Sequence, residues 1–199
     1  MAVRLVYIDT NVIADWIFLK ALSEESELRT KLRASLASFH LINHIFEFYY
    51  EWSARYKFIS SEIALLESLS VVKEGTQIFY LFVEDLSLKY FPQVKRELVI
   101  SEDDKDAILY SIYEFQELAE KSIKLYKPRF DIDDAIEFIL EYCLEPMDAI
   151  HLAIATKYNA DFFITRDRMF LQSAKKKIEE ELGIRPLHPR EFLEELTKQ

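Results

Sequence analysis

Short apolar runs lie near both ends of the chain, separated by stretches with helical spacing. Residues 3–8 form an almost continuous apolar run rich in β-branched side chains, which is typical of a buried parallel strand. Residues 161–164 form a second such run. Residues 184–187 form a third, which Pro186 restricts to the edge of a sheet because proline cannot donate to a ladder on both sides. The pattern therefore predicts strands near both termini.

The segment after the first strand is predicted as helix, strand and helix again. A helix is expected over about residues 12–22, with Thr10 or Asn11 as its cap. Ser23, followed by two acids, predicts another helix that runs to about residue 37. Residues 39–45 are predicted as the second strand, and the helix after it begins near Phe46.

The middle of the chain, about residues 60–143, is predicted as mostly helical. Gly75 is expected to separate two helices, and Pro128 to end a later one. Residues 98–100 are either a short strand or a loop anchored in the core. Helix starts are predicted at Ser60 or Ser61, at Ser101, and at Asp131 or Asp133.

The last third returns to alternating helix and strand. Pro146 suits the first position of a helix, so Asp148 falls in its first turn. A helix over residues 175–182 is ended by Gly183, and a terminal helix begins after His188. Alternation at both ends, with helices between, predicts an α/β fold with a helical insertion.

Four acidic side chains stand where this pattern ends a strand or begins a helix. They are Asp9, Glu47, Asp148 and Asp167. In an open parallel sheet, strand C-termini and helix N-termini meet along one edge, where ligands bind. Four carboxylates at that edge would make an oxygen-rich site suited to Mg²⁺ or Mn²⁺.

Composition narrows the class of protein. The chain has 199 residues, half of them apolar, and only two glycines, which argues against an all-β design with many tight turns. Cys143, the one cysteine, leaves no disulfide framework and no cysteine-based zinc cluster. The net charge of −10 argues against a broad basic surface for nucleic acid, although bound metal and a local basic rim can reverse the sign at a site. With neither a signal peptide nor a membrane-length apolar run, we expect a cytoplasmic protein.

Several of these segments resemble the PIN-domain nucleases, and are similar to the VapC-type toxins of that family. The matching segments are YIDTN at residues 7–11, DAIHLAIA at residues 148–155, ITRDRMF at residues 164–170 and GIRPLHPREFL at residues 183–193. The resemblance implies one PIN-like domain over residues 1–199, with its core at about 1–58 and 144–195 and a helical insertion at about 60–143. It implies a three-layer α/β/α architecture around a parallel sheet of four to five strands.

The same resemblance implies metal-dependent cleavage of RNA by an endoribonuclease. Asp9, Asp148 and Asp167 match the family's acids, and Glu47 matches its early glutamate, with Glu51 one turn later as the alternative. The resemblance gives supporting roles to Thr10, Asn11 and Thr165. It also implies a candidate role as the toxin of a toxin–antitoxin pair, with an antitoxin protein as partner and a homodimer as the assembly.

Phosphodiester hydrolysis explains why such residues would gather. It needs a water made nucleophilic near neutral pH and a stabilised leaving oxygen, and divalent ions supply both. We assign Asp9 and Asp148 to the main metal, with Glu47 helping, and Asp167 to the attacking water or a second metal. Arg166 and Arg168 flank Asp167, so we expect them to contact phosphates.

Other interpretations stay open at this point. Each acid could be a plain helix cap or loop residue, and His151, three residues after Asp148, is more simply a packed or hydrogen-bonded histidine than a metal ligand. Tyr49 and Tyr50 could stack bases or belong to a core. The fold could serve as a non-catalytic scaffold or RNA-binding module. A phosphatase of the haloacid dehalogenase type also begins with a strand and Asp, but it needs a second Asp where this chain has Asn11.

Overall fold

The computed structural model describes residues 2–22, 27–83 and 87–197. In these residues, one five-stranded sheet has the order β3-β2-β1-β4-β5, and all its neighbouring strands are parallel. The strands are β1 (Arg4–Ile8), β2 (Tyr56–Ser61), β3 (Ile123–Tyr126), β4 (Phe162–Ile164) and β5 (Arg185–Leu187). This confirms the predicted α/β class with a central parallel sheet.

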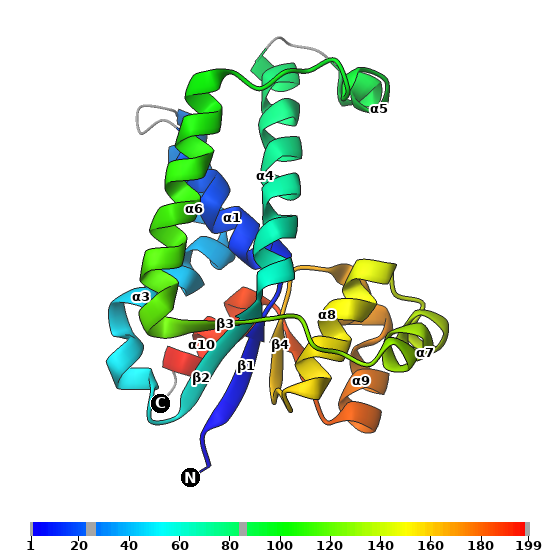
Figure 1. The fold of residues 1–199 in the computed structure, drawn as a ribbon. Coiled ribbons are helices and arrows are strands. Elements are labelled where there is room, and N and C mark those ends of the chain that lie inside the picture. The colour runs from blue at the N-terminus through cyan, green and yellow to red at the C-terminus, as the bar shows by residue number, and fades with distance from the viewer. Residues whose placement is uncertain (1, 23–26, 84–86, 198–199) are drawn as a thin grey trace.

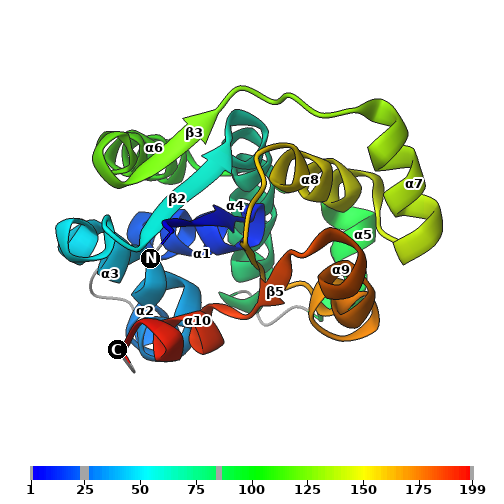
Figure 2. The same cartoon turned by 90° about the horizontal axis from the view of Figure 1, so that it is seen from below.

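Helices cover both faces of the sheet, as Figures 1 and 2 show. On one side lie α1 (Thr10–Ala21), α2 (Glu27–Ser35), α3 (Ala37–Trp52), α6 (Glu102–Ser122) and α10 (Pro189–Thr197). On the other lie α7 (Ile132–Tyr142), α8 (Pro146–Lys157) and α9 (Lys175–Leu182). The long α4 (Glu62–Val83) rises beside α1 and leads to the short elements η1 (Leu88–Tyr90) and α5 (Phe91–Val94); a π-helical turn, η2 (Met169–Ser173), follows β4.

Burial on both faces explains the apolar strand sequences. Along β1, Val6 and Ile8 pack into the core beneath α1, α3 and α6, whereas Tyr7 points into the core beneath α7, α8 and α9. All three side chains are fully buried. A strand that is covered on both faces has no solvent-exposed side, so its sequence is a nearly continuous apolar run.

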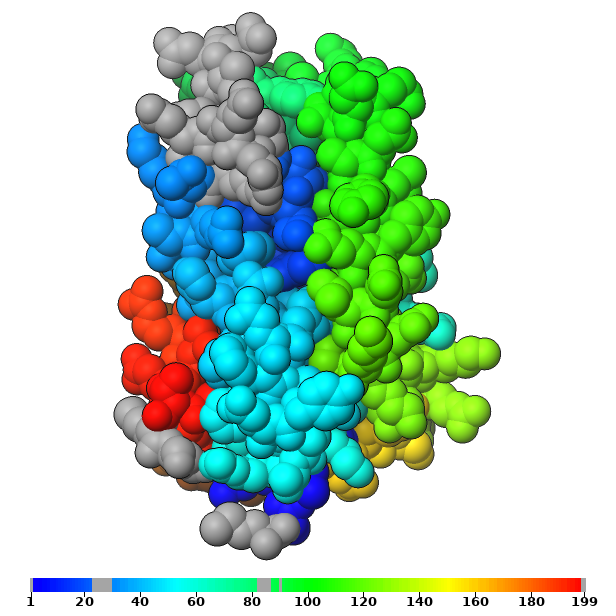
Figure 3. Space-filling view, turned by 90° about the vertical axis from the view of Figure 1, so that its left-hand side faces the viewer, coloured from blue at the N-terminus to red at the C-terminus, as the bar shows by residue number. Residues whose placement is uncertain are grey.

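Helix α1 occupies the centre of the larger core. It contacts α3, α4 and α6, and Figure 3 shows it between α3 and α6 on the surface they form. The Trp16 ring meets the rings of Phe46 and Phe115 edge-on, with centroids 5.6 Å apart in both pairs. Its indole N–H donates to Asn43 Oδ1 at 2.8 Å, so the only polar atom of this ring is satisfied. Aromatic contacts therefore join α1 to both α3 and α6.

The predicted strand at residues 39–45 is wrong, because these residues lie in helix α3. Their buried members, Phe39, Leu41, Ile42 and Ile45, fall on one face of a helix rather than on alternate sides of a strand. A short apolar run does not distinguish the two cases by periodicity alone. The true second strand is β2, which begins after α3 has ended.

Two further boundaries differ from the prediction. Helix α4 runs unbroken past Gly75, where a glycine in a helix costs only about 1 kcal/mol. A Cβ on Gly75 would lie 3.4 Å from the Phe18 ring, so the residue allows α1 and α4 to approach closely. Strand β3 lies inside the segment predicted to be helical, at the edge of the sheet.

Other predictions are confirmed locally. Ser101 caps α6 by accepting a hydrogen bond from the Asp104 amide, Asp131 caps α7, and Pro146 opens α8. Residues 98–100 form a loop in which Ile100 is buried. The predicted cap at residues 23–26 lies outside the described residues. No helix in the described part of the chain is long and apolar enough to span a membrane.

We predict that Phe115→Ala lowers the free energy of unfolding by about 3–5 kcal/mol, because it leaves a cavity beside Trp16 and Phe46. Tyr113→Ala, on the same helix but 65% exposed, is the matched control and should change stability far less. Urea unfolding followed by circular dichroism measures both. Equal losses for the two variants would contradict the central place of α1 and α6 in the core.

Candidate functional site

The candidate site begins at the junction of β1 and α1. Asp9 follows the last residue of β1 and is the N-cap of α1, the role predicted for Thr10 or Asn11. Its side chain is 2% exposed. One oxygen, Oδ1, accepts a hydrogen bond from the Thr10 amide at 2.8 Å. The other, Oδ2, accepts from Asn11 Nδ2 and from Thr165 Oγ1, both at 2.7 Å. Three donors therefore offset the cost of burying this carboxylate.

The loop after β4 is fastened to the same carboxylate. Because Ile8 and Ile164 are partners in the sheet, Thr165 lies next to Asp9. The Asp167 amide donates to Thr165 Oγ1 at 2.9 Å, and Asp167 Oδ1 accepts from the Met169 amide at 2.6 Å. Neighbouring parallel strands thus bring Asp9 and Asp167 together, as the sequence predicts.

Asn11 completes this connection from the side of α1. Its Nδ2 donates to Thr165 Oγ1 at 3.0 Å, and its Oδ1 accepts from the Arg166 amide at 2.9 Å. The side chain holds the loop by both of its polar atoms. The contacts of Asn11 and Thr165 match the supporting positions expected for them.

Asp148 reaches the site from the first turn of α8. Partial burial, then the negative charges of Asp9 and Asp167, raise the pKa of Asp148 to about 7. The pKa of Asp9 is raised too, mainly by burial, although His151, Thr165 and Thr10 oppose the rise. Among the residues that the structure describes, no hydrogen bond engages the Asp148 carboxylate, so its oxygens are free to take a ligand.

The fourth acid at this site is Glu67, not Glu47. Glu67 lies on α4, and its Oε2 accepts from Thr10 Oγ1 and lies against His151 Nε2, both at 2.7 Å. Those contacts lower the pKa of Glu67, the hydrogen bond with His151 being the largest cause. Glu67 also adds negative charge at Asp9 and Asp148.

His151 connects this acid to the core of the sheet. The ring is 1% exposed, and its Nδ1 lies 2.8 Å from the Tyr7 hydroxyl, which is 3.2 Å from Ser61 Oγ. Burial lowers the pKa of His151, but the hydrogen bond to Glu67 and the charge of Asp9 outweigh it and raise that pKa. The expectation of a hydrogen-bonded histidine is therefore confirmed, with Glu67 and the Tyr7 hydroxyl as its partners.

Glu47 is exposed on the second half of α3, and so is its alternative, Glu51. That half of the helix leads towards Tyr56, where β2 starts, whereas the other acids lie where the strands end. The prediction failed because the second strand was placed one element too early. Once β2 is placed at residues 56–61, Glu67 becomes the acid of the helix that follows it, and that spacing was the missed signal.

The two arginines differ in their surroundings. The Arg166 guanidinium forms an ion pair with Asp15 at 2.8 Å, so part of its charge is used within the protein. Arg168 is exposed on the same loop. Contact with phosphate remains a prediction for both.

The donor set fits a hard divalent cation. Carboxylate oxygens are the ligands that Mg²⁺ and Mn²⁺ prefer, and Mg²⁺ keeps several waters, so two carboxylates can suffice. In the described residues, no three acid, histidine or cysteine side chains already converge as a group that could hold a metal ion. The observation that supports the fit is Asp148, whose free oxygens face neighbouring negative charge.

The chain matches a known protein family. A family model described as the PIN domain matches residues 6–176. No curated protein matches the chain. The matched range contains Asp9, Glu67, Asp148 and Asp167, so all four acids lie in the region shared with the family.

We predict that Asp148→Asn stabilises the metal-free protein increasingly as pH rises. The folded-state pKa of Asp148 is raised to about 7 from 3.8, so its contribution to stability is complete below about pH 4 and is lost as pH approaches 7. Asparagine does not titrate. The difference in unfolding free energy, variant minus wild type, should therefore grow between about pH 4 and 8.

Urea unfolding in chelator at several pH values measures this difference. Asp106→Asn, at an exposed position of α6, controls for the loss of one negative charge. A difference that stays constant over the whole range would contradict the raised pKa.

Proposed function

The chain belongs to the PIN-domain family, and we propose from its site that it is a divalent-metal-dependent endoribonuclease. Members of this family are generally nucleases, which act on nucleic acid and typically depend on divalent metal. The observation that carries the proposal is the gathering of Asp9, Asp148 and Asp167 from three separate segments. Burial, and then the negative charges of Asp9 and Asp167, raise the pKa of Asp148 to about 7.

Each of the four acids would have its own role in binding the cation or the attacking water. Asp9 and Asp148 would hold the main cation, because one is rigidly held by three donors and the other has free oxygens. Glu67 takes the place first assigned to Glu47. Asp167, on the loop fastened by Thr165, would orient the attacking water.

A bound divalent cation supplies a water nucleophile at neutral pH and stabilises charge on the leaving oxygen. The chain's own contribution is geometric and electrostatic. Thr10, Asn11 and Thr165 hold the Asp9 carboxylate in place, and His151 orients Glu67. Such preorganisation spares the site from rearranging when substrate binds.

The choice of RNA as substrate, and the narrower role as toxin of a toxin–antitoxin pair, rest on the resemblance to VapC-type toxins. An antitoxin partner and a homodimer belong to that narrower proposal. The acids support nuclease chemistry in general; they do not select among these assemblies.

We predict that Asp9→Asn and Asp148→Asn each reduce RNA cleavage by at least about a hundredfold, since even groups that only orient metal ligands cost up to that much. Asp167→Asn should be milder. The assay is cleavage of a panel of structured RNAs by pure protein in Mg²⁺, Mn²⁺ or EDTA. Undiminished cleavage by the first two variants would sink the site assignment.

Two other outcomes of the same assay have distinct meanings. Neither cleavage nor calorimetric metal binding by the wild type would favour a non-catalytic scaffold or RNA-binding module. Metal binding without cleavage would show that the substrate or an activating partner is missing from the assay.

We further predict that Glu67→Gln weakens Mn²⁺ binding and slows cleavage, whereas the matched change Glu47→Gln does neither. Glu67 contacts Thr10 and His151 at the site, while Glu47 is exposed on α3. Isothermal titration calorimetry gives the affinities, and circular dichroism checks that both variants fold. If Glu47→Gln had the larger effect, the site would have to be rebuilt around α3.

A further inference from the structure

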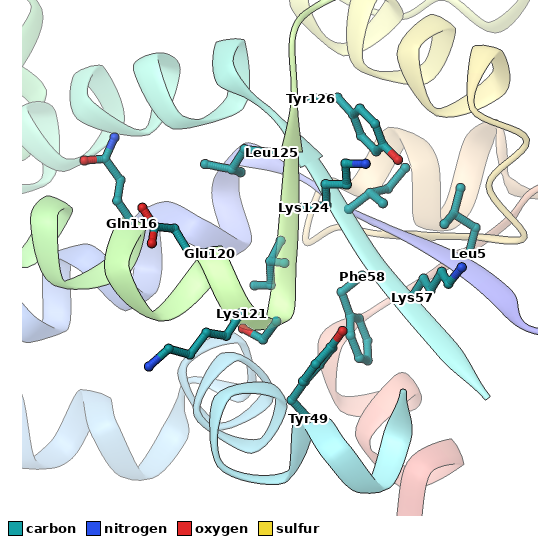
Figure 4. Close-up of a pocket in the computed structure, with 13 residues that line it drawn as sticks. Leu5, Tyr49, Lys57, Phe58, Gln116, Glu120, Lys121, Lys124, Leu125 and Tyr126 are labelled. Atoms are coloured by element: carbon teal, nitrogen blue, oxygen red, sulfur yellow. The ribbon is translucent and has the colours of Figure 1, made fainter. Parts of the chain in front are cut away.

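A hollow of about 770 Å³ opens at the free edge of β3. Figure 4 shows that Lys57 and Lys124 lie on one side of this edge strand, and Lys121 on the other. The Tyr49 ring reaches up from α3, and Tyr126 stands at the end of the strand. The residues that line the hollow thus include three lysines and the aromatic rings of Tyr49, Phe58 and Tyr126.

Several cations of the molecule form ion pairs with neighbouring acids. Lys177 pairs with Glu141 and Lys20 with Glu114, both at 2.7 Å. By contrast, no ion pair within the described residues engages Lys57, Lys121 or Lys124. The Lys124 ammonium lies over the Tyr126 ring, 4.7 Å from its centroid.

Unpaired lysines gathered on a protein of charge −10 indicate an anionic ligand. Glu120 also lines the hollow, so its four charged side chains sum to +2 (three lysines minus one glutamate). The local sign is therefore opposite to that of the whole chain.

Strand register connects the hollow to the candidate active site. Tyr126 is the sheet partner of Ser61, whose hydroxyl contacts the Tyr7–His151 pair. Lys124 is the partner of Ile59, and Lys57 lies two residues further back on β2. Strand residues rise about 3.3 Å each, so this row leads away from the site over about 13 Å.

The side chains of Lys57 and Lys124 lie on the face of the sheet against which α8 packs. Lys124 is paired with Ile59, and Ile59 with Tyr7, so the three side chains stand on the same face of the sheet. That face is covered by α8, which carries Asp148 and His151. Lys57, Lys124 and the helix that carries Asp148 therefore lie on the same side of the sheet.

We propose that this hollow is a subsite for the sugar-phosphate backbone of single-stranded RNA, held by Lys57 and Lys124 beside the edge strand β3. The inference rests on the proposed nuclease function. Ammonium groups bind phosphate as point charges without reading sequence, and exposed aromatic rings can stack bases of any identity. Tyr49, noted in the sequence as a candidate for stacking, lines this hollow.

The test is RNA binding by the full-length Asp148→Asn variant, which removes cleavage as a complication. Fluorescence anisotropy with a labelled single-stranded oligouridylate, in EDTA and at several salt concentrations, gives affinity and salt dependence. Lys57→Gln with Lys124→Gln is the test pair. Lys105→Gln with Lys176→Gln, at exposed positions of α6 and α9, removes the same charge elsewhere.

We expect the test pair to weaken binding by about tenfold, as loss of two charge-assisted contacts should. The slope of log affinity against log salt should also become shallower by about 1.4, because each phosphate contact to single strands contributes about 0.7. The control pair should change neither by as much. A merely structural role for the lysines would not alter the salt slope.

Three results would overturn the proposal. These are equal losses in the test and control pairs, no RNA binding at all, and tight binding of poly-glutamate in place of RNA at the same lysines. The nuclease proposal is judged separately, in the otherwise wild-type protein. There the test pair should raise KM with little change in kcat. Absence of cleavage by the wild type would contradict the nuclease proposal. Cleavage with an unchanged KM in the test pair would contradict only the subsite proposal.

Discussion

The buried carboxylate of Asp9 is the constraint on which the rest of the structure depends. Burying an ionised group costs several kcal/mol unless hydrogen bonds replace its hydration. Asp9 receives them from its own helix and from the end of β4. The pairing of β1 with β4, the start of α1 and the loop after Thr165 must therefore all form together, or the charge is left unsolvated.

The polar interior has two halves that meet at Thr10. The Thr10 amide donates a hydrogen bond to Asp9, and the Thr10 hydroxyl donates one to Glu67. Behind Glu67, His151 and Tyr7 carry hydrogen bonds through to Ser61 on β2. Four segments distant in the sequence are thus connected through one residue at the head of α1, which explains how the acids keep fixed positions despite their repulsion.

Some of this arrangement can be predicted from sequence, and the reasons are local. Strands β1 and β4 are buried on both faces, so their composition alone identifies them, and Asp9 and Asp167 follow at their ends. Pro146 fixes where α8 begins and therefore where Asp148 stands. These positions depend only on neighbouring residues.

What could not be predicted depends on partners far along the chain. The run at residues 39–45 suits either a strand or the buried face of a helix, and only packing against α1 decides. Strand β3 carries the exposed Lys124 at a sheet edge, so it lacks the apolar signal of the inner strands. Glu67 was missed because an early placement of the second strand hides that α4 is the helix that follows it.

The unbroken course of α4 joins two distant parts of the molecule. Its 22 residues span about 33 Å, and Glu67 lies near one end while η1 and α5 follow the other. In the second half of the helix, Lys95 pairs with Glu74, and the Gln77 amide donates to the Leu98 carbonyl. Because α4 is one continuous helix, the same rigid element carries Glu67 at the site and the contacts with the loop after α5.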